Sequence, residues 1–209
     1  MYSRRKKKSF IMVSFRSLVT TILLTFVALP SVIAVTSGTV ISNIQSLKDR
    51  SVAMQAPANE VNIVNAWLFI AGLGPIPGLI NQFKSFNEYT SGLNAAYLNS
   101  PPFPDSDTTA AGISTAFRDF ATQHRILLNI LLGNARISSG GIPELGDILQ
   151  NLSRQIRDVL VYGQGNVTTF KTRIVSLVNA AADQQVEGAF LQLSELYPIV
   201  IDAYTGNLA

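Results

Sequence analysis

The residue best suited to proton transfer in this chain is its single histidine, His124. Arg118 and Asp119 lie about one turn earlier on the same predicted helix, so a carboxylate could approach the imidazole. A catalytic serine, histidine and aspartate set also needs a positioned serine, and the G-x-S-x-G pattern that would supply one does not occur. We therefore interpret His124 as a polar helix residue and predict no catalytic residue.

Acidic side chains offer a second kind of chemistry, because paired carboxylates perform acid–base work in hydrolases. Four of them share the C-terminal helical region: Asp183, Glu187, Glu195 and Asp202. Such hydrolases need a cleft, which a compact helical domain rarely offers. We expect a solvated acidic face here.

Composition excludes several further classes of site. The 209 residues include no cysteine and one histidine, so disulfides, thiolate metal sites and sites with two or more histidines are ruled out. The glycines of 72–74 follow a predicted helix, and the next glycine is displaced to Gly78, which argues against a dinucleotide loop. We predict no metal and no cofactor.

The excess of basic over acidic residues is confined to the first 34 residues, which contain six of the 16 Lys and Arg residues and no acidic residue. The remainder carries 10 basic and 13 acidic residues, so the formal charge changes from +3 to −3. Nucleic-acid binding needs clustered basic residues on the folded part. No nucleic-acid partner is therefore expected.

The N-terminal segment has the pattern of a secretory signal peptide. Basic residues at 4–8 precede an apolar stretch at 18–29 and Pro30, and small side chains predict cleavage after Ala34. Met12 is an alternative start of the same signal. A signal anchor is the competing interpretation, which Pro30 and the threonines of the apolar stretch weaken. The expected domains are a signal peptide at 1–34 and one folded domain at 35–209, and the expected localisation is extracellular or in a cell wall.

Apolar residues in the folded part recur every three to four positions, and alternating strand patterns do not occur. The sequence therefore predicts an all-α bundle of five to seven helices. A cap at Thr39 begins the first, Pro57 and Pro198 are expected to interrupt or kink helices, and Gly133 and Gly163 are expected to end two of them. The helices are expected near residues 40–56, 61–71, 79–97, 107–133, 143–163 and 166–204.

Two segments are more apolar than one helix face requires. No charged residue lies between Glu60 and Lys84. Because a glycine- and proline-rich break in lipid would leave backbone groups unsatisfied, a buried hairpin is favoured over a membrane span. The alternative is an exposed tip that contacts apolar surfaces or lipid. The second segment, 126–132, should cross the bundle centre or line a lipid-sized cavity. The candidate contact residues of the tip are Leu73, Ile76, Leu79 and Ile80.

Two N-x-S/T sequons are candidate glycosylation sites, at Asn151 and Asn166. Asn166 follows Gly163 and Gly165, a pair that predicts a turn, whereas Asn151 falls inside a predicted helix. Asn166 is therefore the favoured acceptor.

One set of motifs comprises residues 47–51, 56–58 and 63–65, Gly74-Pro75-Ile76-Pro77, Ala116-Phe117-Arg118-Asp119-Phe120, His124 and 127–133. Together these motifs resemble a family of small secreted fungal proteins described as UV-inducible, which is close to the hydrophobic-surface-binding and cell-wall galactomannoprotein families. The resemblance spans most of residues 35–209 and implies an all-helical secreted protein, without implying an enzyme activity.

These observations favour a secreted, non-enzymatic glycoprotein of the fungal cell wall or surface that binds hydrophobic surfaces or small lipids. A cell-wall polysaccharide is a further expected partner. The alternative is a secreted effector, associated with virulence, that engages a host protein.

Overall fold

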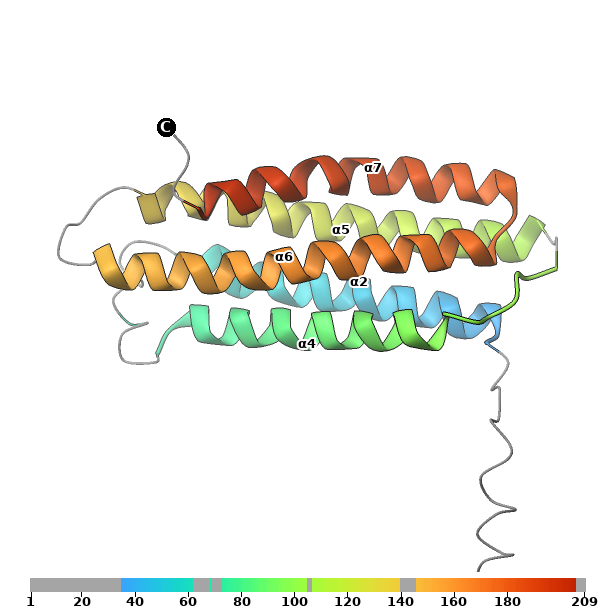
Figure 1. Cartoon of the computed structure of the whole chain (residues 1–209), viewed down its shortest axis with the longest axis horizontal. Coiled ribbons are helices and arrows are strands. Elements are labelled where there is room, and N and C mark those ends of the chain that lie inside the picture. The colour runs from blue at the N-terminus through green and yellow to red at the C-terminus, as the bar shows by residue number, and fades with distance from the viewer. Residues whose placement is uncertain (1–34, 62–67, 69–72, 105–106, 140–145, 206–209) are drawn as a thin grey trace, which may run out of the picture. The chain divides into compact units, whose positions relative to one another are not determined.

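The computed structural model describes residues 35–61, 68, 73–104, 107–139 and 146–205. These residues form five α-helices and no strand, which confirms the predicted all-α bundle. The helices are α2 (Ser37–Glu60), α4 (Pro75–Ala96), α5 (Asp107–Ser139), α6 (Gly146–Leu177) and α7 (Ala180–Ala203), as Figure 1 shows. The predicted signal peptide and most of the predicted 61–71 helix lie outside the described residues.

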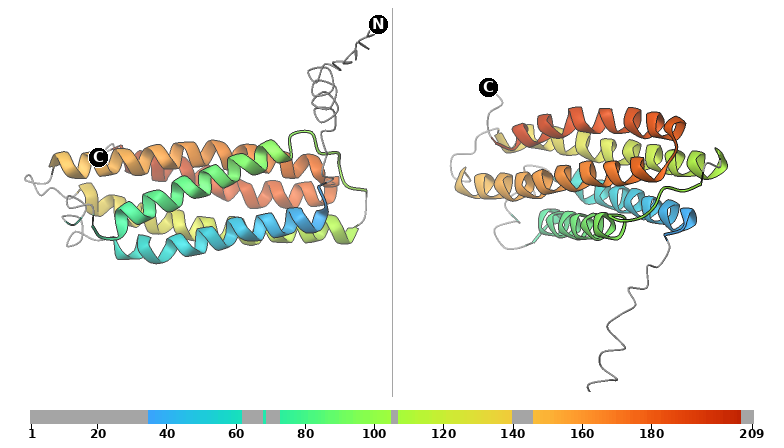
Figure 2. Two further views of the ribbon diagram at one scale, coloured as in Figure 1. Left: turned by 90° about the horizontal axis from the view of Figure 1, so that it is seen from below. Right: turned by 45° about the vertical axis from the view of Figure 1, so that its right-hand side comes forward.

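The five helices close into a ring in which each packs against two main neighbours. Around the ring the order is α2, α5, α7, α6 and α4, and α4 returns to α2. The views in Figures 1 and 2 show that α2, α5 and α7 run in one direction while α4 and α6 run in the other. The pairs α2–α5 and α5–α7 are therefore parallel, although they are formed by helices that do not follow each other in the chain.

Local signals set the helix ends. Thr36, and not Thr39, caps α2, because its Oγ1 accepts a hydrogen bond of 3.2 Å from the backbone N–H of Thr39. Gly74 precedes α4 with a φ of 84°, in the region that favours glycine, and Pro75 takes the first helical position. Asn179 caps α7 through a 3.1 Å bond from the N–H of Ala182 to its Oδ1.

Three predicted helix ends are wrong. α5 continues past Gly133 to Ser139, and α6 runs without a break through Gly163 and Gly165. The region predicted as one helix over 166–204 is divided between α6 and α7 at residues 178–179. Glycine lowers helix propensity by only about 1 kcal/mol, so packing of the surrounding apolar face can override it.

The core is continuous and rich in aromatic side chains. Phe117 stacks with Phe170 at a ring separation of 6.4 Å and meets Phe120 edge-on at 5.8 Å, which joins α5 to α6. Leu127, Leu128 and Leu131 are buried, whereas Ile126 is 40% exposed, so the apolar 126–132 segment turns one face to the core and does not cross the bundle centre.

Across the part of the chain that the structure describes, no helix is both long enough and apolar enough to span a membrane.

Candidate functional site

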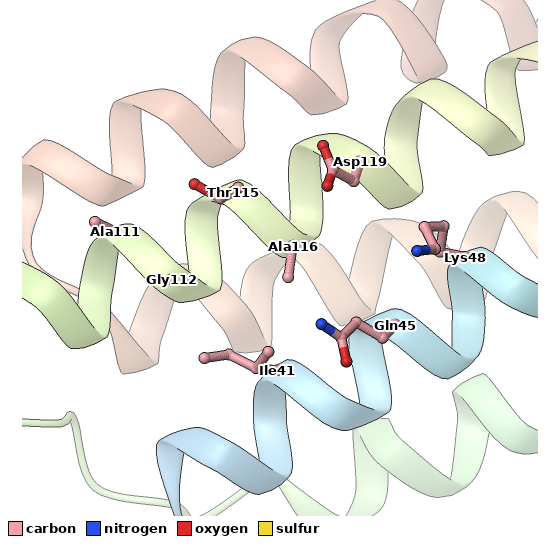
Figure 3. Close-up of a pocket in the computed structure, with 8 residues that line it drawn as sticks. All are labelled: Ile41, Gln45, Lys48, Ala111, Gly112, Thr115, Ala116 and Asp119. Carbon is pink, nitrogen blue, oxygen red and sulfur yellow. The ribbon is translucent and has the colours of Figure 1, made fainter.

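A groove of about 350 Å³ lies between the parallel helices α2 and α5 (Figure 3). It exists because the α5 face is built of small residues. At Gly112 an added Cβ would lie 3.1 Å from Cδ1 of Ile41, so a larger residue would push against α2. The lining residues are Ile41, Gln45 and Lys48 from α2, and Ala111, Gly112, Thr115, Ala116 and Asp119 from α5.

The groove is lined mainly by apolar surface, to which Gln45 and Thr115 add polar groups, and it is charged at one end. Figure 3 shows Lys48 and Asp119 at the end away from Ile41 and Gly112. The Nζ of Lys48 lies 3.7 Å from Oδ1 of Asp49, which is long for a hydrogen bond, so the ammonium can still donate to a ligand. A mainly apolar groove with an ammonium and a carboxylate at one end suits an amphiphile.

The sequence did not lead us to this groove. A sequence pattern that could have predicted the groove is the run of small residues Ala110-Ala111-Gly112, followed by Ala116, because it leaves one face of a helix shallow. Whether such a face becomes a groove depends on which helix packs beside it, and α2 lies about 70 residues away in the chain.

Next to the charged end, side-chain hydrogen bonds hold α2 against α5. Ser51 Oγ and His124 Nδ1 lie 2.9 Å apart, and Gln55 donates to Gln123 O at 3.1 Å. Farther along, Asn134 Nδ2 donates to Ala58 O at 2.7 Å. We call these three contacts the α2/α5 seam.

His124 is fully buried, so the predicted polar helix residue is in fact a core residue. Ser51 donates to Leu47 O at 2.9 Å, which leaves its oxygen to accept from the ring. Assigned on that basis, Nδ1 carries the proton and Nε2 accepts from the Tyr197 hydroxyl at 2.6 Å. Asp119, the carboxylate predicted to approach the imidazole, is exposed and lines the groove.

Burial sets the protonation states of this network. It lowers the pKa of His124 from 6.5 to about 3, because a charged imidazolium would lose its hydration. It also raises the pKa of Tyr197 above the usual value for a phenol. Both groups are therefore neutral near pH 7. Ser51 lies beside an imidazole, as the serine of a nucleophilic pair does, but it has no exposed surface.

All five helices contribute to one polar layer around His124. Asn87 on α4 is buried and donates through Nδ2 to Val159 O on α6 at 2.9 Å. A Cβ added to Gly163 on α6 would lie 3.0 Å from Asn87 Oδ1 and 3.6 Å from Tyr197 Oη. Gly163 therefore leaves space that both side chains approach. The layer consists of Ser51, Asn87, His124, Gly163 and Tyr197.

The structure corrects the location predicted for the apolar contact residues. Ile76, Leu79 and Ile80 are at most 4% exposed and belong to the core. They are buried because they lie on the inner face of α4. Leu73, by contrast, is 59% exposed, so it is the one member of the predicted set positioned to touch an external surface.

The acidic residues of α7 do not form a site. Glu187 pairs with Lys171 of α6 at 2.8 Å, while Glu195 and Asp202 are exposed. Over the described ranges, no group of three or more histidine, aspartate or glutamate side chains could hold a metal ion.

Both sequons lie in α6, as predicted for Asn151 but not for Asn166. Asn166 lies within α6 and not in a turn, and it is half-buried. The Nδ2 of Asn166 donates to the backbone carbonyl of Asn87 at 3.2 Å, and the backbone carbonyl of Asn166 accepts from Asn94 Nδ2 at 3.0 Å. Asn151 lies on the same helix and is exposed.

Compared with known proteins, the chain matches no family model and no curated sequence. Its fold is similar to the crystal structure of AfMP4p in complex with palmitic acid, with a TM-score of 0.65 and 9% sequence identity. The similarity covers 81% of this chain and 99% of AfMP4p. At this identity the likeness establishes a shared helical fold.

Proposed function

We propose that this protein is a secreted, non-enzymatic lipid-binding protein of the fungal cell wall or surface, and that its ligand is a single-chain lipid with an acidic head group. The observation that carries the proposal is the α2/α5 groove, which is apolar along its floor and offers Lys48 at one end. Two similarities support it: the fold shared with a protein crystallised with palmitic acid, and the resemblance to secreted fungal surface proteins.

The size and chemistry of the groove agree with such a ligand. Its volume of about 350 Å³ lies at the lower end of the range of small-molecule sites. An acyl chain would pack along Ile41 and the small residues of α5, and each methylene removed from water contributes about 0.8 kcal/mol. The carboxylate would accept a charge-assisted hydrogen bond from Lys48.

Asp119 limits where the head group can lie. Its carboxylate shares the charged end with Lys48 and repels a second anion, so the head group should approach on the α2 side. We therefore expect Lys48→Met to weaken palmitate binding about 10-fold and Asp119→Asn to strengthen it several-fold. Binding of hexadecanol, which has no charge, should respond to neither substitution.

The decisive experiment fills the groove. Thr115→Trp places a bulky side chain at its exposed rim, while Thr122→Trp does the same in a groove of equal volume between α5 and α7. Calorimetric titration of both variants with palmitate should show a loss of affinity only for Thr115→Trp. Equal binding by the two variants would refute the α2/α5 site, and binding lost only in Thr122→Trp would move the site to α7.

Adsorption to hydrophobic surfaces is a second candidate, favoured by the exposure of Leu73. Leu73→Asp should reduce retention on hydrophobic beads without lowering the melting temperature. Ile76→Asp would instead unfold the domain, because it places a charge in the core. Unchanged retention of the Leu73→Asp variant would refute Leu73 as the contact residue.

A further inference from the structure

We propose that acid opens the α2/α5 seam by protonating His124, and that this opening releases the lipid from the adjoining groove. The release rests on the function proposed above, whereas the opening is a property of the fold alone.

The buried histidine and the groove belong to the same helix pair. Lys48, at the charged end of the groove, is one helical turn from Ser51 on α2, and Asp119 precedes His124 by five residues on α5. The bond between Ser51 and His124 is therefore the first seam contact beyond the groove. Loss of this contact would loosen the wall against which a ligand packs.

A second proton on the ring conflicts with its hydrogen bonds. Neutral His124 donates to Ser51 and accepts from the hydroxyl of Tyr197. A doubly protonated ring has two donors and no acceptor, so the Tyr197 oxygen would have to accept from Nε2 and its O–H would lose its acceptor. The new charge would also remain in the core.

Among the described residues, no acidic side chain contacts His124 to balance that charge, and the ring lies mainly among aromatic side chains. The ring centroid lies 5.0 Å from that of Phe86, 5.5 Å from that of Phe120 and 5.6 Å from that of Tyr197. Tyr197 is the titratable group in contact with the ring and is neutral. The groups that face the ring or complete its layer are Ser51 from α2, Phe86 and Asn87 from α4, Phe120 from α5, Gly163 from α6 and Tyr197 from α7. The nearest charged residues of α5, Asp119 and Arg125, reach the surface.

Linkage gives the size of the effect. Burial holds the pKa of His124 at about 3 in the closed state, and the ring regains its ordinary value of 6.5 once the seam opens to water. The closed state therefore binds fewer protons than the open state at every pH between these two values. At pH 4.5 the ratio of open to closed molecules should be about 100-fold higher than at pH 7.5.

The first arm of the test measures opening without a ligand. Amide hydrogen exchange of the protein at pH 7.5 and 4.5, corrected for the intrinsic pH dependence of exchange, should show about 100-fold lower protection in α2 and α5 beside the seam. In His124→Gln, which keeps a donor and an acceptor but does not titrate, protection should change less than three-fold. Equal loss of protection in both proteins, or no loss in the parent, would overturn the switch.

The second arm measures release with hexadecanol, whose head group does not titrate, beside palmitate. Dissociation of hexadecanol should be up to about 100-fold faster at pH 4.5 than at pH 7.5 in the parent and nearly unchanged in His124→Gln. If palmitate alone dissociates faster in acid, the ligand titrates and the switch is refuted. If neither lipid binds at pH 7.5, the proposed function fails, and the exchange arm still decides the opening.

A third measurement covers the case in which His124→Gln does not fold. The NMR signal of the parent protein labelled with ¹³C at histidine reports protonation of the single ring directly. A ring that titrates together with the loss of seam protection supports the proposal. Seam protection that is lost while the ring stays neutral overturns it.

Discussion

The packing of the polar layer predicts opposite effects on stability when either of two glycines of α6, two residues apart, is replaced with alanine. Gly163 is buried where Asn87 and Tyr197 approach the helix, whereas an added Cβ at Gly165 meets nothing within 4 Å. Both lie inside one continuous helix, so replacing either with alanine gives the same gain in helix propensity. Any difference between Gly163→Ala and Gly165→Ala therefore measures the packing of the layer.

The expected magnitudes follow from the distances. Gly165→Ala should stabilise the protein by about 1 kcal/mol, the usual difference between glycine and alanine in a helix interior. At Gly163 the new methyl group would lie 3.0 Å from Asn87 Oδ1, and the 2.9 Å bond from Asn87 to Val159 O holds that side chain in place. Overpacking of this kind costs about 1–3 kcal/mol, so Gly163→Ala should be destabilising by about 1 kcal/mol.

Urea unfolding followed by circular dichroism provides the assay. The free energies of unfolding of the two variants should differ by about 2 kcal/mol with unchanged m-values, and their melting temperatures by about 4–8 °C. Adding Asn87→Ala to both variants should remove most of the difference, because the clashing oxygen is then gone. If Gly163→Ala is as stabilising as Gly165→Ala, the layer is not tightly packed and the geometry assigned to it is wrong.

Three further predictions concern other parts of the molecule. The parent protein should lose unfolding free energy as the pH falls below 6.5, by up to about 1.4 kcal/mol per pH unit from His124 and most steeply midway between 6.5 and 3. His124→Gln should remove this part of the slope in urea titrations. The sign follows because the unfolded chain binds the proton that the folded chain excludes. Phe117→Ala should destabilise the domain by about 3–5 kcal/mol, since Phe117 is fully buried among other rings, and a loss below 1 kcal/mol on thermal unfolding would contradict the described core. Mass spectrometry of peptides from protein secreted by a eukaryotic host should find a glycan on exposed Asn151 and none on Asn166, whose Nδ2 already bonds to the α4 backbone; the reverse pattern would refute this placement.

Much of the fold could be predicted because helical periodicity is a local signal. The spacing of apolar residues located α2, α4 and α5 and the helical region of α6 and α7, although not the boundary between these two, and the cap-forming and proline residues placed several ends within a few residues. The wrong ends at Gly133 and Gly163 share a cause. A glycine weakens a helix by a small, fixed amount, and the sequence does not show how much packing energy opposes that loss.

Little of the candidate site could be predicted from the sequence. Leu73, Ile76, Leu79 and Ile80 share one apolar stretch, yet one is exposed and three are core, because burial depends on the face that α4 turns to its neighbours. Similarly, the small residues of α5 form a groove only because α2 packs beside them.

The sequence alone determined the helical class, the exclusion of cysteine-based sites and the acidic balance of residues 35–209, since these depend on composition and on spacing within each segment. Only the tertiary structure decided that Ser51, His124 and Tyr197, each separated from the next by 73 residues, meet in one buried layer. The order of the helices around the ring and their rotation about their own axes set these contacts. Both are fixed by the joint packing of five helices and not by the residues near any one position.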